Sequence, residues 1–161
     1  MGTVRVALSP VERFQEFLES RGKRITAQKR LLVEHVFRQH AHFEADQLVE
    51  ELSYGKRASR VSRPTVYRCL SELVEAGLLR AMNLPGRCVY EHDYGYPLHD
   101  HLYCVKCHKL IEFQSDELLR VRAAAASQHQ FQVTGHRLLV QGVCQECRQA
   151  RQRVKRPVDL V

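Results

Sequence analysis

Two cysteine pairs with the same spacing constrain this chain more than any other feature. Cys104 and Cys107 form one Cys-x-x-Cys motif, and Cys144 and Cys147 form a second. Each pair can place two thiolates on one ion, and together they complete a tetrahedral shell. Four sulfur ligands leave no open position for water, so the ion would contribute to folding. The spacing therefore predicts a structural zinc site that fastens the chain end to a strand beginning near His101.

Other uses of these cysteines fit the sequence less well. A thioredoxin-like redox pair requires a βαβ pattern around one motif and leaves the second motif unexplained. A disulfide framework is typical of small secreted domains, whereas this 161-residue chain is long enough to bury a core. Residues 1–9 lack the apolar stretch and cleavage site of a secretory signal, and no run is apolar enough to cross a bilayer. We therefore expect a cytoplasmic protein with reduced thiols and no membrane contact.

The charge of the chain is unevenly distributed. The formal net charge is +7, and residues 1–87 carry 15 Lys and Arg against 10 Asp and Glu. Residues 88–147 carry 5 against 7, and residues 148–161 carry 5 against 1. A basic N-terminal half suggests a polyanionic partner such as nucleic acid. The basic tail, residues 148–161, is expected to be solvated and disordered.

The first half of the chain carries start and stop signals for four helices. Ser9 and Pro10 are a cap and a first helical residue, and Glu12 can complete a capping box. Thr26 can cap the second helix, and Gly77 ends the fourth. The expected helices cover residues 10–21, 27–40, 44–53 and 63–76, and two strands joined by a Leu-Pro-Gly turn cover 78–83 and 87–91. Helices followed by a hairpin predict a winged helix-turn-helix.

The fourth helix has two distinct faces. Val66, Cys69, Leu70 and Leu73 recur at helical spacing and form an apolar stripe, in which Cys69 acts as a small buried hydrophobe. The opposite face is polar and basic, and an α-helix fits the major groove of DNA, where base edges are distinguishable. A solvated face of ordinary basic residues is the alternative. The side chains expected to contact DNA are those of Arg63, Thr65, Tyr67 and Arg68.

The second half is predicted to be a small α/β unit. A short apolar strand at 110–113 precedes a helix that Ser115 can cap, and another strand covers 137–142. Edge strands with the apolar side chains of Leu138 and Val140 predict a dimerisation domain. The fold class is therefore α+β, a winged-helix DNA-binding domain followed by a small α/β dimerisation domain. The expected bounds are 1–92, a hinge at 93–97, 98–147, and the tail at 148–161.

Two histidines indicate a second metal site. His99 and His101 are two residues apart, so in an extended segment their imidazoles point to the same side. Glu91 ends the second hairpin strand, so a site that combines it with both histidines would lie at the junction of the two domains.

Two other classes of function are compatible with parts of this pattern. A zinc hydrolase would use three such ligands and an open position for water. However, the chain has no helical His-Glu-x-x-His motif, no Gly-rich phosphate loop and no nucleophile with an evident base. A zinc-ribbon adaptor would account for the four cysteines but not for the basic half. We therefore predict a protein that is not an enzyme.

The fourth helix also matches a known pattern. Residues 61–68 read Val-Ser-Arg-Pro-Thr-Val-Tyr-Arg, and they are followed by Leu70, Leu73 and Ala76-Gly77-Leu78. This pattern resembles the recognition helix of the ferric uptake regulator family, and the resemblance runs from about Arg13 to Cys147. It implies a metal-dependent transcriptional repressor, an iron-responsive regulator of metal uptake genes. It also implies a homodimer that binds an A·T-rich palindromic operator in double-stranded DNA.

The resemblance assigns roles to individual DNA-contacting residues. It implies that Tyr67 contacts thymine methyl groups and that Arg68 holds a phosphate. Arg24 matches a basic residue inserted into an A·T-rich minor groove, where the negative potential is deeper.

The resemblance also implies the ligands of a regulatory metal site. These ligands are His42, Glu91, His99, His101 and Glu112. Imidazole and carboxylate donors suit Fe²⁺, and they also suit Zn²⁺ and Mn²⁺. Filling the site would tie the two domains together in a pose that binds DNA. An accessory site of the family is matched in part, by Asp100 and His136, while Leu98 and Leu119 stand where a His and a Glu are usual.

Two other branches of the family are alternatives. Peroxide sensors typically have aspartates where this chain has Glu91 and Glu112, which favours a simple metal sensor. Zinc-uptake regulators commonly recruit a cysteine to the sensory site, and Cys88 leaves that option open.

Overall fold

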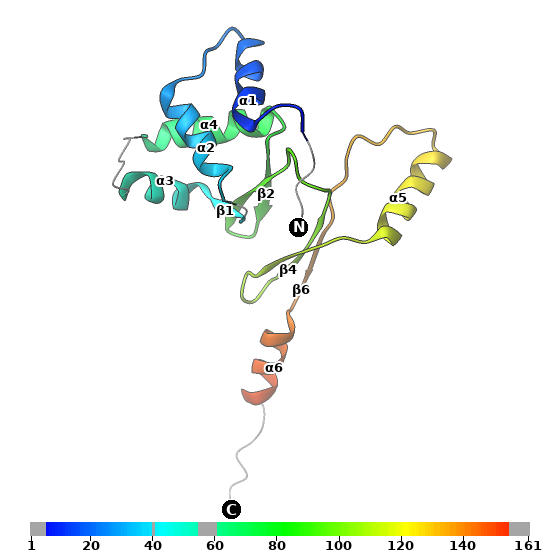
Figure 1. Ribbon diagram of the computed structural model, residues 1–161. Coiled ribbons are helices and arrows are strands. Elements are labelled where there is room, and N and C mark those ends of the chain that lie inside the picture. Colours follow the sequence, from blue (N-terminus) through cyan, green and yellow to red (C-terminus); the bar gives the residue numbers. More distant parts are fainter. Residues whose placement is uncertain (1–5, 40, 55–60, 155–161) are drawn as a thin grey trace, which may run out of the picture. The chain divides into compact units, whose positions relative to one another are not determined.

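The chain forms two compact units, Met1–Pro97 and Leu98–Val161, each with its own three-stranded sheet (Figure 1). The structure is a computed structural model that describes residues 6–39, 41–54 and 61–154. Within these residues, no helix combines the length and the apolar character needed to cross a membrane.

The first two helices begin where their capping residues predict. Helix α1, Pro10–Glu19, has a complete capping box between Ser9 and Glu12. Helix α2, Ala27–Val36, begins after Thr26, whose side chain accepts the backbone N–H of Lys29. Helix α2 ends about four residues earlier than expected. Its last carbonyl, that of Val36, accepts the backbone N–H of Gln39 at 3.3 Å in a tighter turn and also lies 3.0 Å from Nε2 of His92 on the hairpin.

The remaining elements of the first unit form the predicted winged helix. Strand β1, Phe43–Glu44, precedes helix α3, Ala45–Tyr54, and helix α4 covers Arg63–Glu75. Strands β2, Leu79–Leu84, and β3, Arg87–His92, form the hairpin, with Gly86 at φ +79° in its turn. The sheet order is β1-β3-β2, and all pairs are antiparallel. Strand β1 was not predicted because two residues show no periodicity.

The hydrophobic core of the first unit lies among its four helices and the base of the hairpin. The apolar stripe of α4 is fully buried, including Cys69, as expected. Burial raises the pKa of the Cys69 thiol to about 12, so it is an inert core residue. Other fully buried members of the core are Phe14, Leu18, Leu32, Val33 and Leu78.

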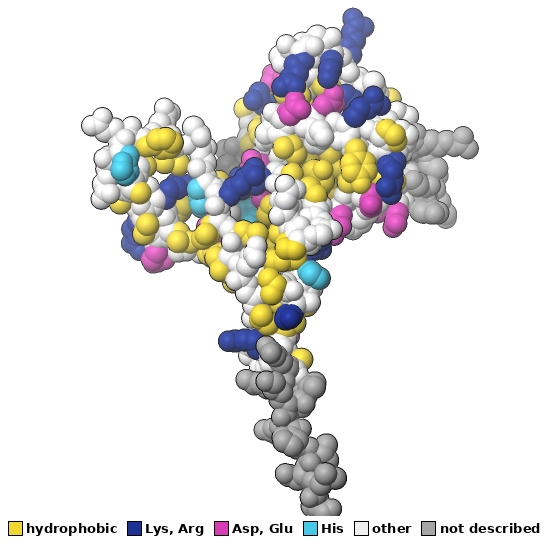
Figure 2. Space-filling model, turned by 180° about the vertical axis from the view of Figure 1, so that it is seen from behind, with side chains coloured by type: hydrophobic (Ala, Val, Ile, Leu, Met, Phe, Trp, Pro, Cys, Tyr) yellow, Lys and Arg dark blue, Asp and Glu magenta, His cyan; other side chains and the backbone are white. Residues whose placement is uncertain are grey.

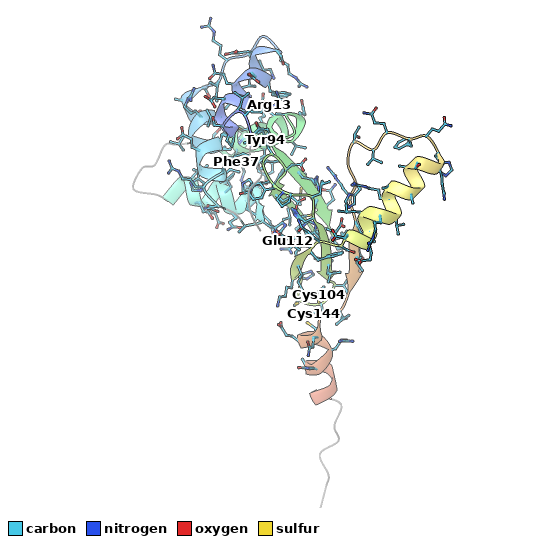
Figure 3. All side chains as sticks on the ribbon, turned by 45° about the vertical axis from the view of Figure 1, so that its right-hand side comes forward. Arg13, Phe37, Tyr94, Cys104, Glu112 and Cys144 are labelled. Carbon is cyan, nitrogen blue, oxygen red and sulfur yellow. The ribbon has the colours of Figure 1, made fainter. Side chains whose placement is uncertain are left out.

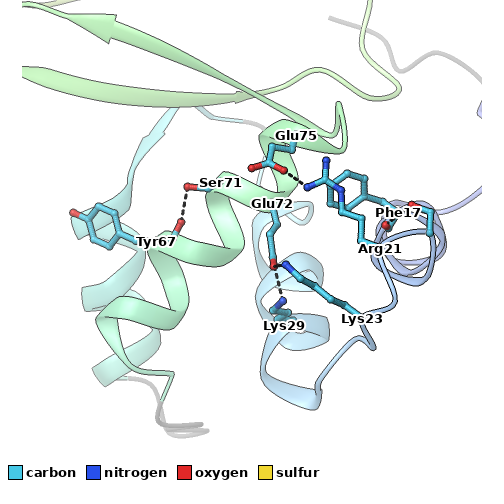
Figure 4. A network of polar contacts seen from close by, with 9 residues as sticks. Phe17, Arg21, Lys23, Lys29, Tyr67, Ser71, Glu72 and Glu75 are labelled. Carbon is cyan, nitrogen blue, oxygen red and sulfur yellow. Dashed lines mark hydrogen bonds and ion pairs between the residues drawn. The ribbon is translucent and has the colours of Figure 1, made fainter.

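Ion pairs connect α4 to α2 and to the segment that joins α1 to α2 (Figure 4). Glu72 on α4 accepts hydrogen bonds from Lys29 and, at 3.1 Å, from Lys23. Arg21 pairs with Glu75 and also lies over the ring of Phe17. The helix that is predicted to read DNA is therefore held by ion pairs, of which Lys29–Glu72 is largely covered, as well as by apolar packing.

The second unit is a small sheet with two helices. It contains the strands β4 (Asp100–Cys104), β5 (Leu110–Phe113) and β6 (Leu139–Gly142). Its helices are α5 (Asp116–Gln128) and α6 (Gln145–Val154). Strand β4 is central, with β5 antiparallel and β6 parallel to it. Ser115 caps α5 as expected, by accepting the N–H of Leu118.

Helix α6 corrects the expectation of a disordered tail from residue 148. The backbone N–H of Arg148 donates to the carbonyl of Cys144 at 3.0 Å, so the second cysteine motif itself forms the first turn of a helix that reaches Val154. The rest of the predicted tail, residues 155–161, lies outside the described residues.

Candidate metal centres and nucleic-acid interface

The four cysteines of the two motifs come together in the second unit. Cys104 ends β4, and Cys144 directly precedes α6 (Figure 3). Cys107 follows β4 in a turn, and Cys147 lies in the first turn of α6. Their four sulfur atoms all lie within 4.8 Å of one another. The sulfurs of Cys107 and Cys144 are 3.7 Å apart. Tetrahedral zinc with Zn–S bonds near 2.3 Å requires S–S edges of about 3.8 Å, so the cluster has the dimensions of a zinc site.

The protonation of these thiols also fits a cation. Backbone N–H groups of Cys107 and Cys144 point at the Cys104 sulfur and lower the pKa of that thiol to about 6. Hydrogen bonds to the sulfurs of Cys144 and Cys107 raise the pKa of the Cys147 thiol to about 12. Four sulfurs packed this closely cannot all lose their protons without a compensating positive charge, and a divalent ion supplies that charge.

Two of the predicted regulatory ligands meet in the first unit. His42 precedes β1 and Glu91 lies in β3, and their Nε2 and Oε2 atoms are 3.2 Å apart. The pairing of Phe43 with Tyr90 places residue 42 opposite residue 91, so the sheet register itself brings this pair together. Glu91 is buried, and Nη1 of Arg80 on β2 lies 3.6 Å from its Oε1. Arg80 is a neighbour of the predicted site that the sequence did not reveal.

Three further predicted ligands lie on the sheet of the second unit. The rings of His99 and His101 are 4.9 Å apart, and both side chains are buried. Glu112 on β5 is the register partner of His101 on β4, so both side chains project from the same face of the sheet. The expectation that the two histidines point to one side is consistent with this geometry.

The option of a cysteine ligand from Cys88 is not supported by the strand register. Cys88 and Glu91 are three residues apart in β3, which pairs continuously with β2. Their side chains therefore project from opposite faces of the hairpin. Cys88 instead shares a face with Tyr90 and contacts its hydroxyl group, one of the causes that raise the pKa of Tyr90 to about 12 after burial itself.

The partial accessory site is occupied by a network that includes an arginine. Nε2 of His136 lies 3.1 and 3.2 Å from the two carboxylate oxygens of Asp100. Nη1 of Arg122 on α5 lies 2.8 Å from the other ring nitrogen of His136. Sequence reasoning missed Arg122 because it is 14 residues from His136 and belongs to no motif.

The predicted DNA-contacting face of α4 is exposed and organised by one carboxylate. The hydroxyl of Tyr67 donates to Oδ1 of Asp46 at 2.6 Å, and Arg63 pairs with the same oxygen at 3.2 Å. Asp46 lies in the first turn of α3, and no motif or spacing singles it out. Arg68 is exposed, whereas Thr65 is half-buried and bonds to the Ser62 hydroxyl at 2.9 Å.

Arg24 lies between α1 and α2, apart from the α4 face. It is exposed, and within the described residues it makes no hydrogen bond or ion pair. Its basic neighbours Lys23 and Lys29 are engaged by Glu72. Arg24 is therefore available to an external anion.

Comparison with known proteins identifies one family. Residues 20–141 match the Ferric uptake regulator family. The ferric uptake regulation protein of Campylobacter upsaliensis is 30% identical over 137 residues, which cover 85% of this chain and 88% of that protein. The peroxide-responsive repressor PerR of Staphylococcus epidermidis is 30% identical over 132 residues, 82% of this chain and 86% of that protein.

Solved structures agree with this fold. The structure of the Vibrio cholerae ferric uptake regulator is 28% identical, covers 81% of this chain and 98% of its own, and gives a TM-score of 0.64. That of Helicobacter pylori gives a TM-score of 0.76 at 21% identity, with coverage of 92% and 97%, and supports the fold alone.

The predicted fold class, a winged-helix domain followed by a small dimerisation domain, is confirmed by these neighbours. Regulators of this family form dimers, bind DNA and respond to metal, and they are not enzymes. The match over most of its length shows that this chain belongs to the ferric uptake regulator family.

Proposed function

We propose that this chain is a cytoplasmic, iron-responsive repressor that binds operator DNA as a homodimer when its regulatory metal site is filled. The observation that carries the proposal is the division of the predicted ligands. His42 and Glu91 meet within the first unit, while His99, His101 and Glu112 share one face of the second. Only residues 92–98 separate Glu91 from His99 along the chain.

The chemistry of these donors fits a regulatory ion. Imidazole nitrogens and carboxylate oxygens are the ligands of Fe²⁺, Mn²⁺ and Zn²⁺ in proteins. A divalent ion supplies one centre to which the donors of both units can bind at once. Glu91 is held beside His42 by the register of β1 and β3, so half of the ligand set is organised before any ion arrives.

Joint ligation would restrict how the two units are oriented in solution. The α4 helices of a dimer can enter successive major grooves only if they lie about 34–36 Å apart along the duplex. A chain without metal would sample several poses, of which few match this spacing. Moving the competent fraction from 1% to 99% requires about 5.5 kcal/mol of differential binding. Several metal–ligand bonds confined to one pose can supply a free energy of that size.

The second unit offers the surface for a second copy. Leu102 on β4 is the register partner of Ile111 on β5 and of Val140 on β6, and each of these side chains is 40–43% exposed. They form an apolar row across the sheet, and hydrophobic side chains are visible at the surface of this unit (Figure 2). Helix α5 contributes no buried side chain. A homodimer would bury this row, as the dimerisation-domain prediction requires.

The four-cysteine cluster is proposed to hold structural Zn²⁺. Its sulfur geometry matches a closed tetrahedral site, with no position left for a substrate. This zinc would join the end of β4 to the start of α6.

The DNA contacts are proposed to come from two parts of the first unit. Arg63, Tyr67 and Arg68 are exposed on α4, and we assign them to the major groove. Arg24, which lies between α1 and α2, is the candidate for an adjacent minor groove. Thr65 is half-buried, so we expect it to contact the sugar–phosphate backbone of the DNA rather than a base.

Gel-shift measurements with operator DNA test this proposal. Wild-type protein is expected to bind in the presence of Fe²⁺ under anaerobic conditions and to lose most of its affinity with a chelator. His101→Ala should abolish the metal dependence while leaving a folded dimer. His129→Ala is the matched control, because this exposed histidine at the end of α5 is not a proposed ligand. Metal-stimulated binding that persists in His101→Ala would remove the proposed site.

A peroxide sensor is the second candidate, because the relatives include PerR. Hydrogen peroxide added to the iron-loaded protein separates the two candidates. A simple metal sensor should recover full DNA binding once the peroxide is removed and fresh Fe²⁺ is supplied. Permanent loss of binding accompanied by oxidation of His42, His99 or His101 would favour the peroxide sensor.

A further inference from the structure

Asp100 lies on the central strand of the second unit, between two proposed metal ligands, but its side chain points to the opposite face of the sheet. Successive side chains in a strand point to opposite faces, so Asp100 and His101 diverge. Asp100 meets His136, from the segment after α5, and His136 meets Arg122 on α5. Only about 5% of the Asp100 side chain and 20% of the His136 side chain are exposed. Three separate segments are thus joined by one polar chain.

The direction of the hydrogen bonds in this chain follows from the chemistry of arginine. A guanidinium group has only donors and stays charged at any pH that a folded protein meets. Because Nη1 of Arg122 lies 2.8 Å from Nδ1 of His136, that nitrogen must accept. Nε2 then carries the ring proton and donates it to the Asp100 carboxylate. Both nitrogens of His136 are therefore in use, and neither offers a lone pair to an ion.

The surrounding residues do not restore a metal site. Among the described residues, neither Asp100 nor His136 belongs to a group of three or more side chains that could hold a metal ion, which leaves one carboxylate and one engaged imidazole. A buried carboxylate nevertheless needs a compensating positive charge. We propose that Arg122 supplies that charge permanently, as a guanidinium that takes the place of the accessory metal ion and clamps α5 to β4.

The clamp matters because α5 has little other attachment. None of its side chains is buried within the described residues. The Asp100–His136–Arg122 chain therefore carries much of the connection between α5 and the sheet. With a permanent cation, this connection is independent of the metal supply. Within the part of the chain that the structure describes, the proposed regulatory site is then the one exchangeable metal site, in addition to the structural four-cysteine cluster.

The clamp is tested by counting bound ions and by thermal unfolding, using Arg122→Met and His136→Ala. Both variants are expected to bind the same number of Mn²⁺ or Zn²⁺ ions per chain as wild type. Both should also unfold at a Tm lower by at least about 4 °C, by the same amount with and without added Mn²⁺, while the four-cysteine zinc is retained in both conditions. Arg122→Lys, which keeps a cation, should recover part of this loss. His136→Ala binding one ion fewer than wild type would overturn the proposal.

A constructed metal site provides an independent arm. Leu119 lies one turn before Arg122 on α5, so the two side chains share a helix face. The double variant Leu119→Glu, Arg122→Met adds a carboxylate and frees His136. In a His101→Ala background, which removes the regulatory site, it should gain one bound Zn²⁺ and a metal-dependent rise in Tm that His101→Ala alone does not show. The proposal is contradicted if metal raises the Tm of wild type by the same amount, if this rise persists in His101→Ala, and if it disappears in His136→Ala. Such a result would place a metal ion at the clamp.

The readouts separate this inference from the proposed function. Neither Arg122 nor His136 is a proposed ligand of the regulatory site. If DNA binding proves independent of metal, the ion count and the Tm of the clamp variants still report on Arg122 alone.

Discussion

At the scale of single residues, Asp46 organises the face that is proposed to read DNA. It accepts the Tyr67 hydroxyl at 2.6 Å and pairs with Arg63 at 3.2 Å. The same hydrogen bond raises the pKa of Tyr67. A carboxylate at this place repels phosphate and engages an arginine that could otherwise bind any phosphate. Asp46 should therefore reduce non-specific affinity more than specific affinity.

Replacing this carboxylate is predicted to relax specificity. In Asp46→Asn, Arg63 loses its ionic partner and becomes free to bind phosphate. Affinity for non-operator DNA should rise, and the ratio of specific to non-specific affinity should fall about tenfold. The dependence of log Kd on log salt should steepen by about one unit on non-operator DNA. Fluorescence anisotropy at several salt concentrations measures both quantities. Glu50→Gln removes the same charge from the same helix and should change the specificity ratio less. Equal changes in the two variants would mean that Asp46 acts only through its net charge and not through its contacts with Tyr67 and Arg63.

Individual site residues could be predicted where their chemistry is local. Each cysteine pair and the His99–His101 pair can be recognised within four residues of sequence. The structure brings the four cysteines together, and likewise the two histidines, within the second unit. Asp46, Arg80 and Arg122 could not be found this way. Each meets its partners only through the packing of distant segments, and no sequence spacing encodes that contact.

At the scale of elements, the attachment of α4 to α2 depends on Glu72. Burial raises the pKa of this carboxyl, but hydrogen bonds from Lys29 and Lys23 outweigh burial, and the pKa is lowered overall. Its side chain is 14% exposed, so the pair with Lys29 is screened less than a surface ion pair.

Removing this charge is predicted to cost stability in a way that depends on pH. The folded-state pKa lies below the unfolded value of about 4.3, so the contribution of Glu72 is present above that pH and is lost as pH falls through the folded value. Glu72→Gln should lower the free energy of unfolding by about 1 kcal/mol at pH 7, and the difference from wild type should shrink below about pH 4. Urea unfolding followed by circular dichroism checks this. Glu75→Gln removes a carboxylate from a more exposed ion pair and should lower the free energy of unfolding less. A difference between Glu72→Gln and wild type that does not change with pH would contradict this role of Glu72.

Most elements could be predicted because their signals are periodic or are set by caps. Ser9, Thr26 and Ser115 mark helix starts that the structure reproduces. Strand β1 and helix α6 were missed for different reasons. Strand β1 has two residues and exists because β3 pairs with it. Helix α6 is highly polar and lacks an apolar stripe, so composition suggested disorder.

At the scale of the whole molecule, the two units differ in what stabilises them. Of the buried hydrophobic residues that the structure describes, nearly all belong to the first unit, whereas the second contributes Tyr103 and Cys104 from β4. A unit with so small a core needs another source of stability, and a structural metal with a dimer partner supplies it.

Loss of zinc is therefore predicted to unfold the second unit first. Cys107→Ser removes one thiolate from the cluster, and amide hydrogen exchange read by mass spectrometry reports each unit separately. Residues 98–154 should lose protection in the variant, while the helices of the first unit keep theirs. Cys88→Ser is the matched control, because that thiol lies outside the cluster, and it should leave both patterns unchanged. Uniform loss of protection in Cys107→Ser would mean that the two units fold as one.

The central claim is that one ion is ligated by both units, and anomalous diffraction from crystals of the dimer loaded with Mn²⁺ or Fe²⁺ tests it most directly. The account predicts an anomalous peak within bonding distance of Glu91 and of His99 and His101 in the same chain. A loaded crystal in which these side chains point apart, with no peak among them, would contradict it.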